Sequence, residues 1–289
     1  MTTVPPAVME RARLVLAHAA VQRVADLNGV DLLHVKGYAT DPAIRWEGRI
    51  STDVDVLARP AHIPRLIAAL TALGWNRYHG FETGSPFGHA QTLLHETWGY
   101  LDIHRHFPGI MVDRSAAFER LWADRGKVDM GGITCAVPSL PAQRLIVVLH
   151  AARLTDRARR HRDVEAAWDA ASEEEQTELR QLVEGLRAEV GFAAAVGGLD
   201  AYRDRPEYLL WRIQSQGGTR VEEWWARIRV APTARGKIRL VLRAPLVNVE
   251  HLAVVLGHQP TRAEVVREFF ARLARGVREE WRRRRGVPT

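Results

Sequence analysis

Segments with the pattern of β-strands all lie in the first half of the chain, and this uneven placement constrains the fold more than any other feature. After Pro138 apolar residues recur instead at helical spacing, as far as the C-terminal arginines. We therefore expect an α/β (α+β) protein in two parts, with a mixed-sheet domain at 1–137 and a helical domain at 138–289. The strand-like runs, rich in apolar and β-branched residues, are 30–35, 52–58, 75–80, 90–96, 99–107 and 127–137.

Helices are also expected between these strands. Apolar residues at helical spacing span 8–27 and stop at Asn28-Gly29. Pro60 and Asp113 are placed to begin further helices, which we expect over 60–73 and 113–122. The sheet is thus predicted to carry helices packed on it, and Gly131-Gly132 predicts a hairpin turn within its last run.

The composition excludes several classes of protein. The single cysteine, Cys135, cannot form an intrachain disulfide and fits a reducing compartment. No apolar run approaches the roughly 20 residues of a membrane helix, and the N-terminus lacks the pattern of a signal peptide. We expect a cytoplasmic protein with no membrane partner.

The positive charge of the chain is concentrated in its second half. The net charge is +7, and the stretch 226–246 carries six basic residues and no acid. From Thr261 onward, nine arginines face four glutamates. Such a surplus suits a polyanionic partner such as RNA, although a solvated helix face accounts for it equally well, since no RNA-binding motif with spaced aromatic residues accompanies it.

Two aspartates stand inside an apolar strand. In the run 52–58, Asp53 and Asp55 are two residues apart and so project from the same face of the strand, while Val54 and Val56 point the other way. Two adjacent carboxylates repel each other unless a cation lies between them, and hard oxygen ligands suit Mg²⁺ or Mn²⁺. The alternative is an exposed edge strand with two surface acids.

Neighbouring residues favour the metal site over the edge strand. Asp102 alternates with apolar residues in a later strand and adds a third carboxylate. Several further residues are candidate contacts for phosphate, by backbone N–H groups or polar side chains: Lys36, Gly37, Arg49, Ser51 and Thr52.

Three stretches together resemble a known superfamily. The stretches "HVKGYATDPAIRWEGRISTDVDVLA", "ALGW" and "YLDIHRHF" are similar to the nucleotidyltransferase fold of the DNA polymerase β-like superfamily. The nearest pattern is that of a group of uncharacterised bacterial nucleotidyltransferases, which reads LKG, then R, then DIDLLV, then D/E-I-H. The resemblance covers roughly residues 15–170.

The resemblance implies a role for each matching residue. It makes Asp53, Asp55 and Asp102 the catalytic metal ligands, and it places Gly37 where the superfamily has the glycine of a Gly-Ser pair. Tyr38 stands where that serine is expected, so Ser51 or Thr52 would have to replace it. His104 is expected to orient Asp102 or to touch the substrate.

The activity implied is metal-dependent transfer of a nucleoside monophosphate from an NTP to a hydroxyl acceptor, which can be a small molecule, a peptide or a protein. Two alternatives stay open: a toxin-like nucleotidyltransferase acting on RNA or tRNA, and a non-catalytic nucleotide- or RNA-binding relative. A zinc hydrolase built on "DIHRH" has weak support, because His-x-His alone is a poor ligand set. No P-loop or Rossmann fingerprint is present.

Two residues of the second half are further candidates. The stretch 157–167 resembles the Arg-x-x-Lys-Asp element of abortive-infection nucleotidyltransferase toxins, which would make Asp163 a fourth catalytic acid. An i,i+3 pair between Arg160 and Asp163 on a helix explains the same residues. His150 lies on an apolar helix, where packing is the simpler explanation.

Overall fold

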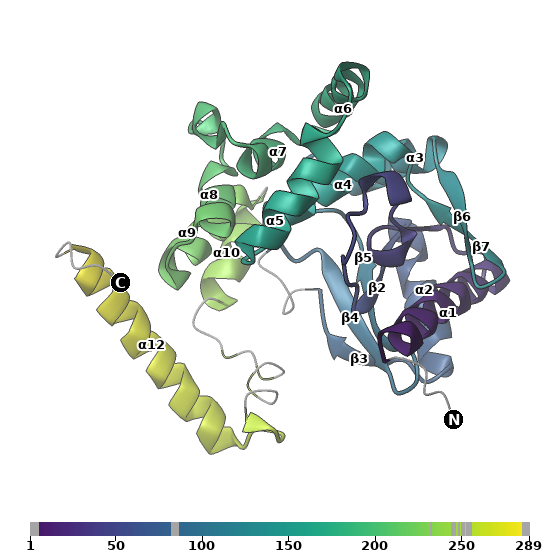
Figure 1. Ribbon diagram of the computed structural model, residues 1–289. Helices are drawn as coiled ribbons and strands as arrows, with labels where there is room; N and C mark the ends of the chain where they lie inside the picture. Colours follow the sequence, from purple (N-terminus) through teal and green to yellow (C-terminus); the bar gives the residue numbers. More distant parts are fainter. Residues whose placement is uncertain are drawn as a thin grey trace. The chain divides into compact units, whose positions relative to one another are not determined.

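A five-stranded mixed sheet forms the framework of the N-terminal part of the protein (Figure 1). The structure is a computed structural model and describes residues 6–81, 87–231, 233–243, 247, 249, 252 and 256–284. The strand order is β1-β2-β5-β4-β3, in which β2 and β5 run parallel and the other neighbours antiparallel. The strands are β1 Leu32–His34, β2 Asp53–Ala58, β3 Asn76–His79, β4 Ala90–His95 and β5 Gly99–His104.

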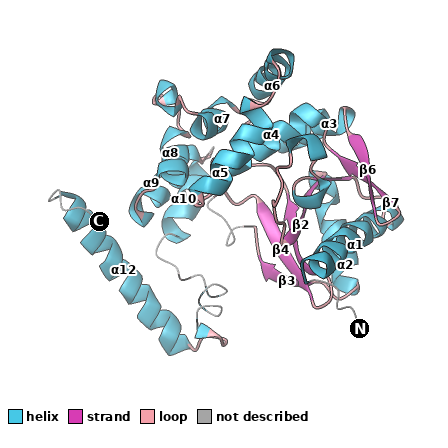
Figure 2. Cartoon of the chain, viewed as in Figure 1, coloured by secondary structure: helices cyan, strands magenta, loops and turns pink. Residues whose placement is uncertain are grey.

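A two-stranded hairpin lies beside this sheet, and helices pack on both (Figure 2). The hairpin consists of β6 Gly126–Met130 and β7 Ile133–Val137, joined at Gly131-Gly132 as predicted. The α-helices that precede it are α1 Pro6–Leu27, α2 Ile63–Ala72 and α3 Arg114–Ala123. Single-turn 3₁₀ helices are η1 Gly37–Ala39, η2 Pro42–Ile44 and η3 Pro60–His62. The predicted α/β (α+β) fold class is confirmed.

All described elements after Val137 are helical. They are α4 Leu140–Ala151, α5 Arg157–Val164, the π-helical turn η4 Glu165–Asp169, α6 Glu173–Gly185, α7 Glu189–Val196, the 3₁₀ turn η5 Leu199–Tyr202, α8 Tyr208–Gln216, α9 Arg220–Val230, α10 Ala234–Arg243 and α12 Arg262–Arg284. None of the helices in the described part of the chain is long and apolar enough to cross a lipid bilayer.

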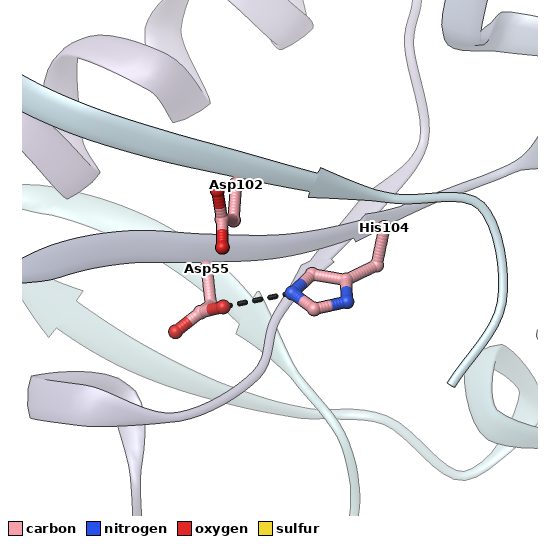
Figure 3. A group of neighbouring side chains, drawn as sticks. All are labelled: Asp55, Asp102 and His104. Atoms are coloured by element: carbon pink, nitrogen blue, oxygen red, sulfur yellow. Dashed lines mark hydrogen bonds and ion pairs between the residues drawn. The ribbon is translucent and has the colours of Figure 1, made fainter. Parts of the chain in front are cut away.

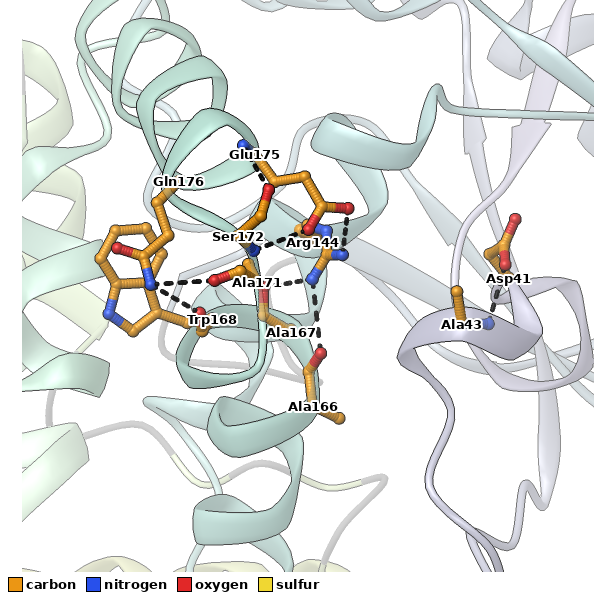
Figure 4. A network of polar contacts seen from close by, with 10 residues as sticks. All are labelled: Asp41, Ala43, Arg144, Ala166, Ala167, Trp168, Ala171, Ser172, Glu175 and Gln176. Atoms are coloured by element: carbon orange, nitrogen blue, oxygen red, sulfur yellow. Dashed lines mark hydrogen bonds and ion pairs between the residues drawn. The ribbon is translucent and has the colours of Figure 1, made fainter.

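By its contacts the chain divides into two units, Met1–Gly197 and Gly198–Thr289. The change to helices at residue 138 and this division after Gly197 fall at different places, because α4 to α7 share the core of the first unit. Arg144 of α4 illustrates the connection: it donates to Glu175 of α6 at 2.7 Å and to the carbonyl of Ala167 at 3.2 Å (Figure 4).

The two faces of the sheet bury different sets of side chains. Val54 and Val56 of β2 pack with Leu101 and Ile103 of β5 and with residues of α1 and α2. Leu57 of β2 points the other way and packs in a second cluster with residues of α4. Since side chains alternate along a strand, the face that carries Leu57 also carries Asp53 and Asp55. The predicted carboxylates therefore lie on the sheet face that looks toward α4.

Candidate functional site

The three predicted carboxylates come from two adjacent parallel strands. Asp55 of β2 is directly opposite Asp102 of β5 in the strand register, and Asp53 precedes Asp55 on the same face. Figure 3 shows Asp55, Asp102 and His104 converging from these strands. Their ligand atoms, one from each residue, lie within 4.8 Å of one another.

Asp55 is held by two basic side chains. Its Oδ1 lies 2.6 Å from Lys36 Nζ and 2.7 Å from His104 Nε2, and its side chain is buried. Burial opposes ionisation of Asp55, but the charge of Lys36 and the hydrogen bond and charge of His104 outweigh it and hold the pKa of this carboxyl well below its usual range. Asp55 is therefore ionised at neutral pH.

Asp53 has the opposite electrostatic character. The charge of Asp55, burial and the charge of Asp102 raise the pKa of Asp53 to about 7, although Lys36 and a hydrogen bond from Thr52 lower it. The Thr52 hydroxyl lies 3.4 Å from Asp53 Oδ1. A carboxyl with such a pKa marks a place with too much negative charge, which a cation would relieve.

The residues fit a divalent cation. Asp55 and Asp102 offer carboxylate oxygens, which Mg²⁺ and Mn²⁺ prefer, and His104 completes the group of potential ligands. Lys36 and His104 both contact Oδ1 of Asp55, and Oδ2 has no hydrogen-bond partner within the described residues. The metal ligands predicted from the sequence were Asp53, Asp55 and Asp102. The structure groups the last two with His104, while Asp53 is coupled to them by charge.

His104 does not orient the residue that we expected. Its Nε2 bonds to Asp55, whereas Asp102 accepts a hydrogen bond of 2.6 Å from the Thr92 hydroxyl on β4. The reason is the register: Asp55 and Asp102 are directly opposite each other, so His104, two residues beyond Asp102 on the same face, reaches across to β2.

The predicted glycine turn lies next to the carboxylates. Gly37 has φ 61°, and a side-chain carbon there would lie 2.5 Å from the hydroxyl oxygen of Ser51. The Ser51 hydroxyl in turn donates to the carbonyl of Asp53 at 3.1 Å. Gly37 is thus required for the close approach of Ser51, and the serine that was expected to stand in for Tyr38 does lie beside the turn.

Arg49 is engaged by Asp163. Its Nε lies 2.9 Å from Asp163 Oδ1, both side chains are almost fully buried, and the indole N–H of Trp46 donates to the same oxygen at 2.8 Å. The contact of Arg49 with phosphate stays a prediction. Asp163 pairs with a residue 114 positions away, while Arg160, the partner expected on its own helix, donates to the carbonyl of Ala194.

Two residues near the carboxylates, Arg153 and His89, are not indicated by any motif in the sequence. Arg153, which follows α4, lies with one guanidinium nitrogen 3.4 Å from His89 Nε2, and the ring centre of His89 is 5.1 Å from that of His104. Neither residue belongs to a recognisable spacing with Asp53 or Asp102. The apolar helical pattern that ends near His150 was the available signal, because it brings the end of α4 to this face of the sheet.

Comparison with known proteins gives distant likenesses. No protein-family model matches the chain, and no curated protein matches it. Three solved structures are similar in part. The first is the lincosamide antibiotic adenylyltransferase LnuA in its lincomycin-bound form, at 18% identity and a TM-score of 0.38, covering 54% of this chain and 97% of that one.

The second is the antibiotic-resistance factor ANT(2'')-Ia, at 15% identity and a TM-score of 0.44, covering 61% of this chain and 94% of that one. The third is a nucleotidyltransferase-like protein from Paracoccidioides brasiliensis, at 18% identity and a TM-score of 0.35, covering 64% of this chain and 92% of that one. All three likenesses are loose and partial, so the proposals below rest on the residues of this chain.

Proposed function

We propose that the protein is a metal-dependent nucleotidyltransferase, which moves a nucleoside monophosphate from an NTP to a hydroxyl acceptor. The observation that carries the proposal is the group of carboxylates on two adjacent strands, in which Asp55 of β2 lies opposite Asp102 of β5 and Asp53 precedes Asp55 on the same face. The sequence resemblance to nucleotidyltransferases, which runs through these same residues, supports it independently.

The residues would have separate roles in such a site. Asp55 and Asp102, with Asp53 or His104, would hold Mg²⁺ or Mn²⁺. A divalent ion held by these residues would lower the pKa of a hydroxyl and offset negative charge on phosphate oxygens. Lys36 holds Asp55 ionised, and His104 fixes the orientation of Asp55 through Oδ1. Gly37 allows the turn to lie close to Ser51, because a side-chain carbon there would collide with the Ser51 hydroxyl.

Nucleotide binding is the direct test. Calorimetric titration with ATP, GTP, CTP and UTP, each with Mg²⁺, should give binding by the wild type and at least a tenfold loss of affinity in Asp53→Asn/Asp55→Asn. The matched control is Asp124→Asn/Asp169→Asn, which removes two carboxylates that are exposed in the structure. If no NTP binds to the folded wild type, the transferase proposal fails.

Metal binding can be tested separately from nucleotide binding. Because Asp53 is about half protonated near pH 7, Mg²⁺ binding there should displace protons. Titrations of Mg²⁺ in two buffers with different ionisation enthalpies measure this release. The release should disappear in Asp53→Asn, and a wild type that binds Mg²⁺ without losing a proton contradicts the raised pKa of Asp53.

The acceptor class follows from a further measurement. Transfer of label from a labelled NTP to a small molecule, a peptide or a protein supports the first assignment. The basic stretch 226–246 keeps RNA as the alternative acceptor. RNA binding through phosphates would weaken steeply as salt rises, in a gel-shift titration between low and physiological salt. Binding of NTP without transfer to any acceptor would favour the non-catalytic relative.

A further inference from the structure

Arg153, a partly buried residue that follows α4, stands out among the basic residues of the first unit. Its guanidinium carbon lies 5.6 Å from the ring centre of Phe87 and 5.7 Å from that of Phe107, and one terminal nitrogen lies 3.4 Å from His89 Nε2. Its Nε is buried and has no hydrogen-bond partner. The side chain is therefore surrounded by aromatic rings and one imidazole.

No acid neutralises Arg153 within ion-pair distance among the residues that the structure describes. Two buried arginines of the same unit do have acidic partners: Arg49 pairs with Asp163 at 2.9 Å, and Arg144 pairs with Glu175 at 2.7 Å. Burial lowers the pKa of Arg153 to about 10, while the more distant charge of Asp55 raises it. A guanidinium with that pKa stays charged at neutral pH, and aromatic rings and a neutral imidazole offset that charge less than a carboxylate would.

The imidazoles around Arg153 supply no negative charge. A histidine ring is either neutral or positively charged, so His89, His106 and His150 cannot neutralise a guanidinium. His89 Nε2 faces a guanidinium N–H and must accept from it, which puts the ring proton on Nδ1. That Nδ1 is buried and without a partner. The region thus holds two unused donors, Arg153 Nε–H and His89 Nδ1–H.

Lys36, the other cation near the carboxylates, already has an acidic partner. Asp55 offsets Lys36 by a direct contact, and the charge of Arg153 is left over. An anion with several charged oxygens would offer acceptors to the two unused donors, Arg153 Nε–H and His89 Nδ1–H.

We propose that Arg153, together with His89, binds a phosphate-class oxyanion beside the carboxylate group. The proposed function identifies its source as the pyrophosphoryl part of an NTP, and the inference rests on that function only for this identification; a phosphorylated acceptor would present the same chemistry. Arg153 then takes the part that the sequence suggested for Arg49, whose guanidinium is occupied by Asp163.

The experiment uses the full-length protein and the variants Arg153→Gln, Arg153→Lys and Arg157→Gln. Arg157 is an exposed arginine four residues away and serves as the control. Binding of inorganic pyrophosphate is measured by calorimetry in EDTA, so that no metal bridges the ligand to the aspartates. Thermal unfolding without ligand and binding of each NTP with Mg²⁺ are measured on the same samples.

The expected result is a tenfold to hundredfold loss of pyrophosphate affinity in Arg153→Gln, since a charge-assisted pair of hydrogen bonds is removed. Arg153→Lys should lose less, because the charge remains without the planar fork. Arg157→Gln should bind as the wild type does. The unfolding temperature of unliganded Arg153→Gln should equal or exceed that of the wild type, because a partly buried charge without an acidic partner is gone.

Other results overturn the inference. A structural role for Arg153 predicts a lower unfolding temperature, or no folding, in Arg153→Gln, and either result contradicts an unpaired charge. Failure of the wild type to bind pyrophosphate also contradicts it. The two proposals can fail separately. If the wild type binds pyrophosphate but no NTP, the anion site is supported and the transferase proposal fails. If wild type and Arg153→Gln bind NTP equally well, the transferase proposal stands and the role of Arg153 in binding the phosphates is contradicted.

Discussion

Lys36 combines an unfavourable backbone conformation with a buried charge. Its φ of 144° and ψ of −174° fall in a region that is populated almost entirely by glycine, which costs a non-glycine residue about 1–3 kcal/mol. The glycine that follows also has a positive φ. In this conformation the Lys36 ammonium lies 2.6 Å from Asp55 Oδ1. The backbone strain therefore occurs at the residue whose side chain forms the ion pair with Asp55.

Two substitutions at Lys36 separate these effects. Lys36→Ala and Lys36→Gly both remove the partner of Asp55 and should both abolish activity and lower stability. Lys36→Gly should nevertheless unfold at higher denaturant than Lys36→Ala, with a free energy of unfolding greater by about 1 kcal/mol, because relief of strain exceeds the extra chain entropy of glycine. Equal stability of the two variants, measured by urea unfolding, would mean that the backbone at Lys36 is relaxed.

Asp53 makes stability depend on pH in a defined direction. Its pKa is about 7 in the folded protein and 3.8 as the ordinary value, so the folded state binds more protons between these values. Its contribution to stability is therefore full below pH 4 and is lost as the pH rises to about 7. In metal-free protein Asp53→Asn should raise the free energy of unfolding at pH 8 by about 2 kcal/mol.

The pH series supplies the control for this prediction. The gain in Asp53→Asn should shrink as the pH falls from 7 and vanish below pH 3.8, where the carboxyl is mostly protonated in both states. With saturating Mg²⁺ the wild type should become more stable than Asp53→Asn, because the metal stabilises the wild type and the variant lacks one carboxylate. A gain that is the same at pH 4 and pH 8 would show that charge repulsion is not its cause.

At the scale of elements, the pair of Arg49 and Asp163 connects the segment leading into β2 with α5. Both side chains are almost fully buried, and Trp46 donates a third hydrogen bond to Asp163. Removing one partner leaves a buried charge alone, which typically costs about 3–5 kcal/mol, whereas replacing both by apolar groups costs much less. The site residues that follow, Ser51 to Asp53, depend on this anchor for their position.

A double-mutant cycle measures this anchor. Asp163→Leu and Arg49→Met should each lower the free energy of unfolding by about 3 kcal/mol, and the double variant should lose clearly less than their sum. Asp200→Asn, in an exposed pair with Arg203, provides the comparison and should have little effect. Additive losses in the double variant would mean that the two residues act independently. A catalytic acid at Asp163 would instead give loss of activity in Asp163→Asn with stability unchanged.

The sequence predicted the local elements well because their signals are local. Alternation of apolar residues indicated all five strands of the sheet, and the paired aspartates indicated the carboxylate group at β2 and β5. The strand order β1-β2-β5-β4-β3 could not be predicted from local sequence patterns, since it depends on which strand inserts between β2 and β4. The same holds for Arg49 with Asp163 and Arg153 with His89, pairs separated by 114 and 64 residues that no short-range spacing can reveal.

At the scale of the whole molecule, the core of the first unit draws on residues from both sides of Val137. One cluster packs Leu33 and Leu57 of the sheet against Leu145 and Val148 of α4, together with residues of α6 and α7. The three core clusters of the described residues all lie before Gly197. The sheet, α4, α6 and α7 therefore share one core, and Asp53 and Asp55 lie on the sheet face that this core covers.

Two truncations test this organisation. A chain ending at Gly197 should unfold cooperatively and bind NTP with Mg²⁺, because it keeps the whole core and the residues from Lys36 to Arg153. A chain ending at Val137 should fail to fold, because it loses the fully buried leucines of α4 and leaves the face of the sheet that carries Leu57 without its cover. Circular dichroism during heating and the NTP titration measure both outcomes.

If the shorter chain folds and binds nucleotide, the predicted domain of residues 1–137 is autonomous and α4 contributes only stability. If the chain ending at Gly197 folds but does not bind, residues 198–289 take part in nucleotide binding, and their basic stretches become the first place to look.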